Sequence, residues 1–178
     1  EALKVAREFQ RATPKLAAGF VLEADVLAQQ RKFDAAISLL NKAQSLQVQS
    51  TVALRIHQLQ LAAKRPAEAD AGLQQWLNAH PNDLAARLYH AESYLARKQN
   101  KAAIAQYEIL LKAQPDNVLV LNNLAALYQQ EKDTRALATA ERAYKLKPDV
   151  AAVADTLGWI LVEQGQAARA VGLLRKAA

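Results

Sequence analysis

Residues 84–117 have the sequence LAARLYHAESYLARKQNKAAIAQYEILLKAQPDN. A small residue stands inside each half of this stretch, Ala91 in the first and Ala103 in the second, and Pro115 lies near its end. Small side chains let two helices approach closely, and proline ends one helix and starts the next. The stretch therefore predicts two packed helices followed by a proline-containing turn.

The same spacing recurs along the whole chain at steps of 33 or 34 residues. One row consists of alanines in the second half of each unit: Ala2, Ala36, Ala69, Ala103, Ala136 and Ala170. A second row marks the turn between units: Pro14, Val48, Pro81, Pro115 and Pro148. A third row lies in the first half of each unit: Ala24, His57, Ala91, Ala125 and Gly158. A fixed period of this length is the signature of a repeat protein.

These rows, together with Tyr94, Tyr128 and the Leu157/Gly158 pair, resemble the consensus of tetratricopeptide (TPR) repeats. The resemblance implies an all-α fold, a right-handed α-solenoid (superhelix) of TPR helix-turn-helix repeats. Isolated helices of about 12 to 15 residues are marginal in water, so each helix must bury its apolar stripe on its neighbours.

We expect residues 1–178 to form a single TPR array, in which residues 1–12 are the second helix of a preceding repeat. The five following repeats start at about Ala17, Ser50, Leu84, Val118 and Ala151. Repeat four is one residue short around residues 131–134, and repeat two departs most from the consensus, with His57 at a small-residue position and Gln60 where an aromatic is expected. Because the chain starts and stops within amphipathic patterns, we expect it to be a fragment of a longer protein.

Composition supports a helical scaffold without catalytic chemistry. Hydrophobic residues make up 52% of the chain, and five glycines and five prolines leave little room for a turn-rich β-fold. With no cysteine and three histidines that lack helical metal-site spacing, we predict no catalytic residue, no metal site and no cofactor. Gly158, Gly165 and Gly172 each have a place in the repeat, so a phosphate-binding loop is not expected.

The distribution of charge argues against two further classes of partner, nucleic acid and the lipid bilayer. The net charge of +6 is spread as single residues or pairs over turns and outer helix faces, so we do not expect nucleic-acid binding. The longest uncharged run, residues 117–130, is too short to cross a bilayer, which needs roughly 20 apolar residues.

The two tryptophans are assigned differently. Trp76 falls on the buried stripe of its helix, so core packing is the preferred interpretation. Trp159 follows the small Gly158 and faces the wall formed by the first helix of each repeat, so it is a candidate binding anchor.

In proteins that resemble TPRs, ligands lie along the concave wall built from the first helices. Carried over by register, this candidate partner-binding groove consists of Asp25, Arg55, Gln58, Tyr89, Glu92, Asn122, Asn123, Asp155 and Trp159. For any one of them, an ordinary solvated helix face is the alternative. The Lys/Asn clamp by which chaperone-binding TPRs hold a carboxylate is not expected, because the corresponding positions contain no lysine: Val21, Leu54, Leu88, Asn122 and Asp155.

The segment LNNLAALYQQEKDTRALATAERAYKLKPDVAAVADTLGWILVEQG, residues 121–165, is similar to the C-terminal region of the TPR-repeat lipoproteins of PEP-CTERM/exosortase systems. The upstream segments LQQWLNAHPND and AIAQYEILLKAQPDN are similar to the same family. This resemblance implies a lipid-anchored envelope protein of a Gram-negative bacterium, facing the periplasm and associated with protein sorting and exopolysaccharide production, with its anchor outside these residues. A cytoplasmic location stays open.

The expected function is therefore a non-enzymatic scaffold that binds a protein or peptide in the concave groove. Two alternatives stay open: a polysaccharide-binding scaffold, and a self-association module that joins through the ends of the array.

Overall fold

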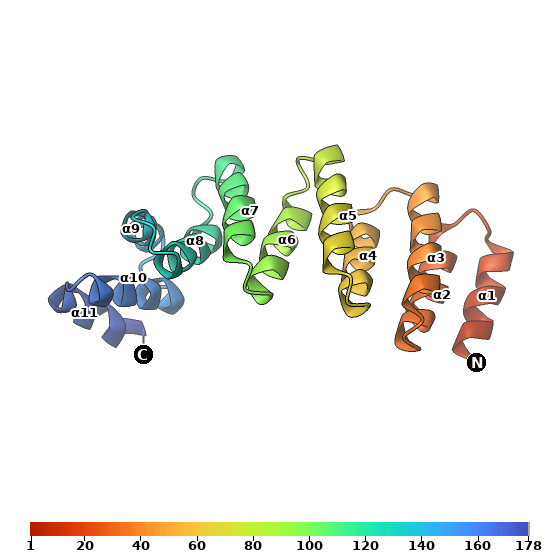
Figure 1. The fold of residues 1–178 in the computed structure, drawn as a ribbon, viewed down its shortest axis with the longest axis horizontal. Coiled ribbons are helices and arrows are strands. Elements are labelled where there is room, and N and C mark those ends of the chain that lie inside the picture. The colour runs from red at the N-terminus through yellow and green to blue at the C-terminus, as the bar shows by residue number, and fades with distance from the viewer. Residues whose placement is uncertain (178) are drawn as a thin grey trace. The chain divides into compact units, whose positions relative to one another are not determined.

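The computed structural model describes residues 1–177, and side chains through Arg175. These residues form eleven α-helices and no strand (Figure 1), so the predicted all-α class is confirmed. The helices are α1 (Ala2–Ala12), α2 (Ala17–Gln29), α3 (Phe33–Leu46), α4 (Ser50–Ala62), α5 (Pro66–Ala79), α6 (Leu84–Ala96), α7 (Asn100–Ala113), α8 (Val118–Gln130), α9 (Ala136–Leu146), α10 (Ala151–Glu163) and α11 (Ala167–Ala177). The even-numbered helices α2 to α10 begin at the residues where repeats are expected to start.

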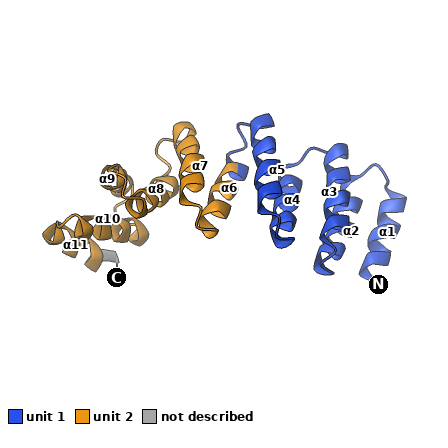
Figure 2. Ribbon diagram, in the orientation of Figure 1, with its two compact units in different colours: residues 1–86 blue, residues 87–178 orange. Residues whose placement is uncertain are grey.

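The chain divides into two compact units (Figure 2). Unit 1 ends at Ala86, so it contains α1 to α5 and the first residues of α6. Unit 2 begins at Arg87 and contains the rest of α6 and the helices that follow. Within each unit, consecutive helices pack side by side as helix-turn-helix pairs.

The five even-numbered helices α2 to α10 end in the same left-handed turn. A residue with positive φ follows each of them: Arg31 (59°), Lys64 (60°), Lys98 (57°), Lys132 (55°) and Gly165 (73°). The next amide donates a hydrogen bond to the carbonyl five residues back, as from Asp133 N to Tyr128 O at 2.8 Å. This Schellman arrangement satisfies carbonyls at the helix end, and glycine is its usual left-handed residue. Here four of the five turns hold lysine or arginine instead.

The turn of repeat four is the shortened one. Only three residues separate its left-handed residue, Lys132, from the framework alanine Ala136. As a result, α9 begins at Ala136 itself, and Arg135 stands before it as the N-cap residue.

The framework alanines form close helix contacts in both units. Ala36, Ala69, Ala103 and Ala170 are completely buried and Ala136 is nearly so. Ala2 differs, because it is exposed at the start of α1, where no earlier helix of the described residues packs on it. The small residues of the first helices are buried as well, so the predicted close approaches are present.

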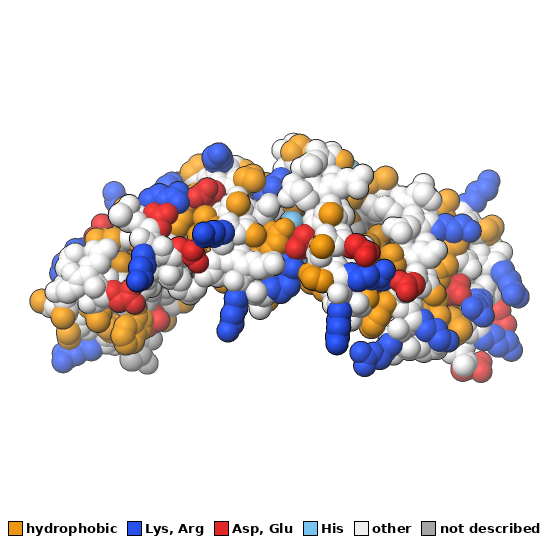
Figure 3. Space-filling view, viewed as in Figure 1, with side chains coloured by type: hydrophobic (Ala, Val, Ile, Leu, Met, Phe, Trp, Pro, Cys, Tyr) orange, Lys and Arg blue, Asp and Glu red, His pale blue; other side chains and the backbone are white. Residues whose placement is uncertain are grey.

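None of the described helices has the length and hydropathy needed to span a bilayer. On the face shown in Figure 3, basic and acidic side chains are interspersed over both units.

Candidate functional site

Three of the nine predicted groove residues lie in unit 1, on α2 and α4. Arg55 Nε lies 2.9 Å from Asp25 Oδ1, so these two side chains form an ion pair between consecutive first helices. Gln58 is exposed one turn further along α4. Asp25 and Arg55 therefore neutralise each other and present little net charge to a ligand.

The other six residues lie in unit 2, and Asn123 among them has an internal partner. Its Nδ2 donates to the hydroxyl of the buried Tyr107 at 3.1 Å. Burial raises the pKa of Tyr107 above its usual 10.0; the Asn123 hydrogen bond opposes this, and the negative charge of the exposed Glu92 adds to it. Asn123 thus joins α8 to α7. Tyr89, another of the six residues, is half-buried on α6.

Asn122 differs from its neighbour. Its side chain is half-buried, and its Oδ1 is shielded from solvent and accepts no hydrogen bond from any described residue. A buried acceptor without a donor costs free energy, about 1 to 3 kcal/mol. A ligand that supplies a donor to this atom would recover that cost.

Trp159 lies in a pocket between α8 and α10. The side chain is 54% exposed, which is unusual for the largest apolar residue type. The pocket has a volume of about 550 Å³ and is lined by Ala126, Gln129, Gln130, Lys132, Asp155, Thr156, Trp159 and Glu163. The structure therefore brings together Asp155 and Trp159 of the predicted groove, and adds the end of α8 to them.

Gly158 explains why Trp159 faces outward. A Cβ atom at Gly158 would lie 2.7 Å from the Leu174 side chain, so any larger residue at this position would force Leu174 to shift. With Gly158 buried against α11, the next residue lies about 100° around the helix and away from that contact. The close contact expected at Gly158 is therefore present, and the role of Trp159 as a binding anchor stays a prediction.

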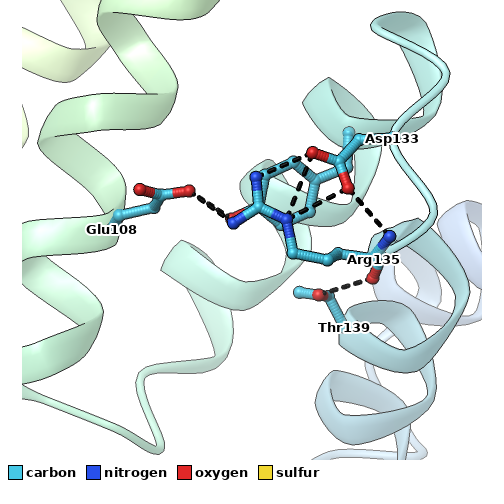
Figure 4. A network of polar contacts seen from close by, with 5 residues as sticks. Glu108, Asp133, Arg135 and Thr139 are labelled. Atoms are coloured by element: carbon cyan, nitrogen blue, oxygen red, sulfur yellow. Dashed lines mark hydrogen bonds and ion pairs between the residues drawn. The ribbon is translucent and has the colours of Figure 1, made fainter.

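A polar network that sequence reasoning missed joins α7 to the shortened turn before α9 (Figure 4). The Arg135 guanidinium lies 2.7 Å from Glu108 and 2.7 Å from Asp133. It also stacks over the ring of Tyr128 at 4.1 Å, and the Tyr128 hydroxyl donates to Glu108 at 2.8 Å. Glu108 and Arg135 are separated by 27 positions, so no local pattern could have indicated this contact.

The pKa values in this network follow from its contacts. The side-chain hydrogen bonds from Arg135 lower the pKa of Asp133 to about 2. Burial, and then the hydrogen bond to Glu108, raise the pKa of Tyr128 well above its usual range. All partners are held by one another, so we assign this network to stability.

The structure corrects the interpretation of Trp76 as a residue of the core. It is half-buried, stacks on His80 at 3.9 Å, and its indole N–H donates to Asp83 at 2.8 Å. Burial raises the pKa of Asp83, but hydrogen bonds from Ser50, the Ala86 amide and Trp76 outweigh it and lower the pKa overall. Trp76 therefore supports the turn between α5 and α6.

Arg87 of α6 is a further feature that the sequence did not indicate. Its side chain is 5% exposed and donates to Gln106 of α7 at 2.9 Å. His57 and His90 are also buried, and His57 Nε2 lies 3.5 Å from Asp70.

No protein-family model matches the chain. A curated relative, the TPR repeat-containing protein PA4667 of Pseudomonas aeruginosa, is 31% identical over 162 residues. Structures of MamA and YrrB superpose with TM-scores of 0.67 and 0.67 at 17% and 15% identity. The chain has the helical-repeat fold of TPR proteins. This agrees with the TPR resemblance and with the predicted helical solenoid.

The matched residues make up 87% of this TPR chain but only 27% of PA4667, so the chain spans about a quarter of that relative's length. The MamA superposition covers 86% of this TPR chain and 91% of MamA, and the YrrB superposition covers 99% and 92%. YrrB is described as a TPR protein with an unusual peptide-binding site. At these identities the superpositions establish the fold alone.

Proposed function

We propose that this TPR chain is a non-enzymatic scaffold whose Trp159 pocket binds an extended segment of a partner protein that carries a basic residue. The observation that carries the proposal is the exposure of Trp159 inside a pocket formed by two consecutive first helices. Aromatic side chains in such positions are frequent anchors of protein interfaces.

Charge around Trp159 supports a basic ligand. Asp155 and Glu163 lie one helical turn before and after Trp159 on α10, and both line the pocket. Neither carboxylate makes an ion pair with any described side chain, and Lys132 is the opposing charge at the rim. A lysine or arginine over the indole ring would gain a cation–π contact together with two nearby carboxylates.

Asn122 supports an extended peptide backbone. It lies one helical turn before Ala126 on α8, and Ala126 lines the Trp159 pocket. Its side chain is half-buried, and a turn of the amide would let the unpartnered Oδ1 accept a backbone N–H from a segment that leaves the pocket along α8. A peptide supplies such donors at regular intervals, whereas a bare side-chain ligand does not.

The test is a selection of random linear peptides displayed on phage, with wild-type protein and two variants as bait. Trp159→Ala removes the anchor, and Leu119→Ala is the matched control, because Leu119 is 51% exposed in the same unit. We expect lysine- or arginine-containing peptides to be enriched by wild type and Leu119→Ala and lost with Trp159→Ala. Asn122→Ala should weaken the selected peptides by roughly threefold to tenfold, the value of one hydrogen bond.

Enrichment that is equal for Trp159→Ala and wild type would place the binding surface elsewhere. If no peptide is enriched, a glycan array with the same three proteins tests the polysaccharide alternative. Circular dichroism of each variant separates loss of binding from loss of folding.

A role in envelope protein sorting and exopolysaccharide export belongs to the same proposal. It rests on the similarity of residues 121–165 to PEP-CTERM-system lipoproteins, together with a lipid anchor outside these residues. Co-purification of the full-length protein from detergent-extracted membranes, compared with the aqueous fraction, tests this location. Recovery only in the aqueous fraction would contradict it.

Self-association is a second candidate function, favoured by exposed apolar side chains on α1. Val5 and Phe9 of α1 are 56% and 39% exposed, one turn apart on the same face. Light scattering after size-exclusion chromatography should detect a dimer that Val5→Glu converts to a monomer. A monomer for wild type at all concentrations would exclude this alternative for the chain.

A further inference from the structure

A second pocket, in unit 1, is separate from the predicted groove. It lies over α4 between α3 and α5 and has a volume of about 440 Å³, within the size range of ligand pockets. Its walls include the apolar side chains of Ile56, Leu73 and Trp76, and the amides of Asn41 and Gln60 lie among them. We call it the α3–α5 pocket.

The α3–α5 pocket coincides with the place where the repeat pattern is broken. Gln60 lies three residues after His57, as Tyr128 lies three residues after Ala125 in unit 2. Position 60 is therefore the position at which repeats three and four carry a tyrosine. A glutamine side chain lacks the volume of that ring, so a hollow at this position has a direct cause.

Unit 2 shows what occupies the equivalent space when a tyrosine is present. Tyr128 is 4% exposed, and its hydroxyl donates to Glu108 of α7. Glu108 lies five residues after Ala103, and the residue five after the equivalent Ala36 is Asn41. Asn41 lines the α3–α5 pocket, so a polar partner stands in unit 1 where Tyr128 finds its acceptor in unit 2.

Gln60 also contributes an acceptor that is not used. Its Oε1 is shielded from solvent and accepts no hydrogen bond from the described residues. A buried acceptor in an apolar pocket favours a ligand that is mostly apolar and carries one donor. A phenol group meets these requirements, since its ring packs on Ile56 and Trp76 while its O–H donates to Gln60 and its oxygen accepts from Asn41.

We propose that the α3–α5 pocket is a socket for a tyrosine side chain of a partner polypeptide. The ring takes the space that an internal tyrosine takes in unit 2, so the partner completes the packing of repeat two. This site is independent of the Trp159 pocket, and its residues lie entirely within unit 1.

The experiment is an NMR titration of the whole chain with p-cresol, the side-chain analogue of tyrosine, and with toluene, which lacks the hydroxyl. The Trp76 indole N–H is the reporter, assigned with Trp76→Phe, and the Trp159 indole N–H is the internal control. We expect a saturable shift of the Trp76 signal alone, with toluene binding roughly threefold to tenfold more weakly than p-cresol because it makes no hydrogen bond.

Two variants sharpen the test. Gln60→Tyr supplies the ring from the chain itself, so p-cresol should no longer saturate the Trp76 signal. Gln60→Leu keeps an apolar pocket but removes the acceptor, so the preference for p-cresol over toluene should shrink to what the Asn41 hydrogen bond alone supplies. Retained helical circular dichroism shows that each variant is folded, and Gln60→Leu keeps the test valid if Gln60→Tyr does not fold.

A capped Ala-Tyr-Ala peptide and its Ala-Phe-Ala counterpart distinguish a partner polypeptide from a free phenol. The proposal requires the tyrosyl peptide to shift the Trp76 signal and the phenylalanyl peptide to do so more weakly. It is overturned if p-cresol gives no saturable shift, if toluene binds equally well to wild type, or if Gln60→Tyr binds p-cresol like wild type. Binding of p-cresol without binding of the tyrosyl peptide would assign the socket to a small phenol instead.

Discussion

The helices α3 to α5 of unit 1 and α7 to α9 of unit 2 are built on the same register but differ at one decisive position. In unit 2, Tyr128 fills the space over its helix, and Arg135, Glu108 and Asp133 hold that ring in place. In unit 1, Gln60 leaves a pocket of about 440 Å³ at the equivalent position.

The difference shows that framework and specificity are separable in this repeat. The framework alanines Ala36 and Ala103 are equally buried in the two units, so helix packing does not depend on what stands at position 60 or 128. A single side chain then decides whether the space beside the framework is filled by the chain or open to a ligand.

The largest expected effect comes from breaking the shared framework. Ala36→Glu in unit 1 and Ala103→Glu in unit 2 each place a carboxylate at a completely buried position, and each should lower the free energy of unfolding by about 3 to 5 kcal/mol. Ala35→Glu and Ala105→Glu are matched controls at exposed neighbouring positions. Urea unfolding followed by circular dichroism measures the loss. A wild-type midpoint for either buried variant would refute the framework role of that alanine.

Replacing Tyr128 of unit 2 by the glutamine found in unit 1 should lower the free energy of unfolding by less than the Ala→Glu variants do. Tyr128→Gln removes a buried ring, with an expected loss of about 2 to 4 kcal/mol, because the surrounding helices close the space only partly. Tyr128→Phe keeps the ring and loses the bond to Glu108, with an expected loss of about 1 kcal/mol. Calorimetric melting of both variants gives the comparison, and equal losses would show that the hydroxyl and not the ring matters.

The left-handed turns offer a smaller effect of opposite sign. Lys64→Gly in unit 1 and Lys132→Gly in unit 2 should each raise stability by about 0.5 to 1 kcal/mol, because glycine adopts positive φ without strain. Gly165→Lys should lower stability by about 1 kcal/mol, because lysine is strained at positive φ. The space around Gly165 is open, so a steric clash does not add to this loss. Melting temperatures check all three. A destabilised Lys64→Gly variant would mean that this lysine has a stabilising contact that outweighs its backbone strain.

The smallest expected effect is a pH dependence present in unit 2. The pKa of Asp133 is lowered from 3.8 to about 2 in the folded state, so its contribution to stability is present above pH 4 and is lost as the pH falls towards 2. Urea unfolding over this range should show a steeper decline for wild type than for Asp133→Asn. Asp116→Asn, which removes another exposed acid paired with arginine, serves as the control. Parallel curves for wild type and Asp133→Asn would contradict the assignment.

The fold was predictable because the signals that specify it are local and repeated. Small residues at fixed intervals mark the helix contacts, and the expected repeat starts coincide with the starts of α2, α4, α6, α8 and α10. The irregularities were visible too, since Gln60 departs from the repeat pattern and residues 131–134 are one short. What the sequence could not show was the consequence of each, a pocket in one case and the Arg135 network in the other. Both depend on side chains that meet only across helices.

The candidate groove was predictable only in part. Register places Trp159 and Asp155 on the same wall, and both line one pocket, but register cannot distinguish Asn122, with its unused acceptor, from Asn123, which bonds Tyr107. Adjacent residues on one helix differ by about 100° in direction, and one direction leads to a neighbouring helix. Similarly, the positive φ of Arg31, Lys64, Lys98 and Lys132 has no signature in the sequence, because lysine and arginine are not typical left-handed residues.

These four basic residues also bear on how the protein resists digestion. Trypsin-type proteases cut after lysine and arginine, and all four side chains are exposed. Their backbones, however, are left-handed and locked by the hydrogen bond from the following amide, whereas a protease must bind an extended strand. Cleavage after Arg31, Lys64, Lys98 or Lys132 must therefore wait for the turn to open, so its rate depends on the local stability of each repeat. Each of these turns thus carries its own probe of local unfolding, readable by mass spectrometry without any labelling.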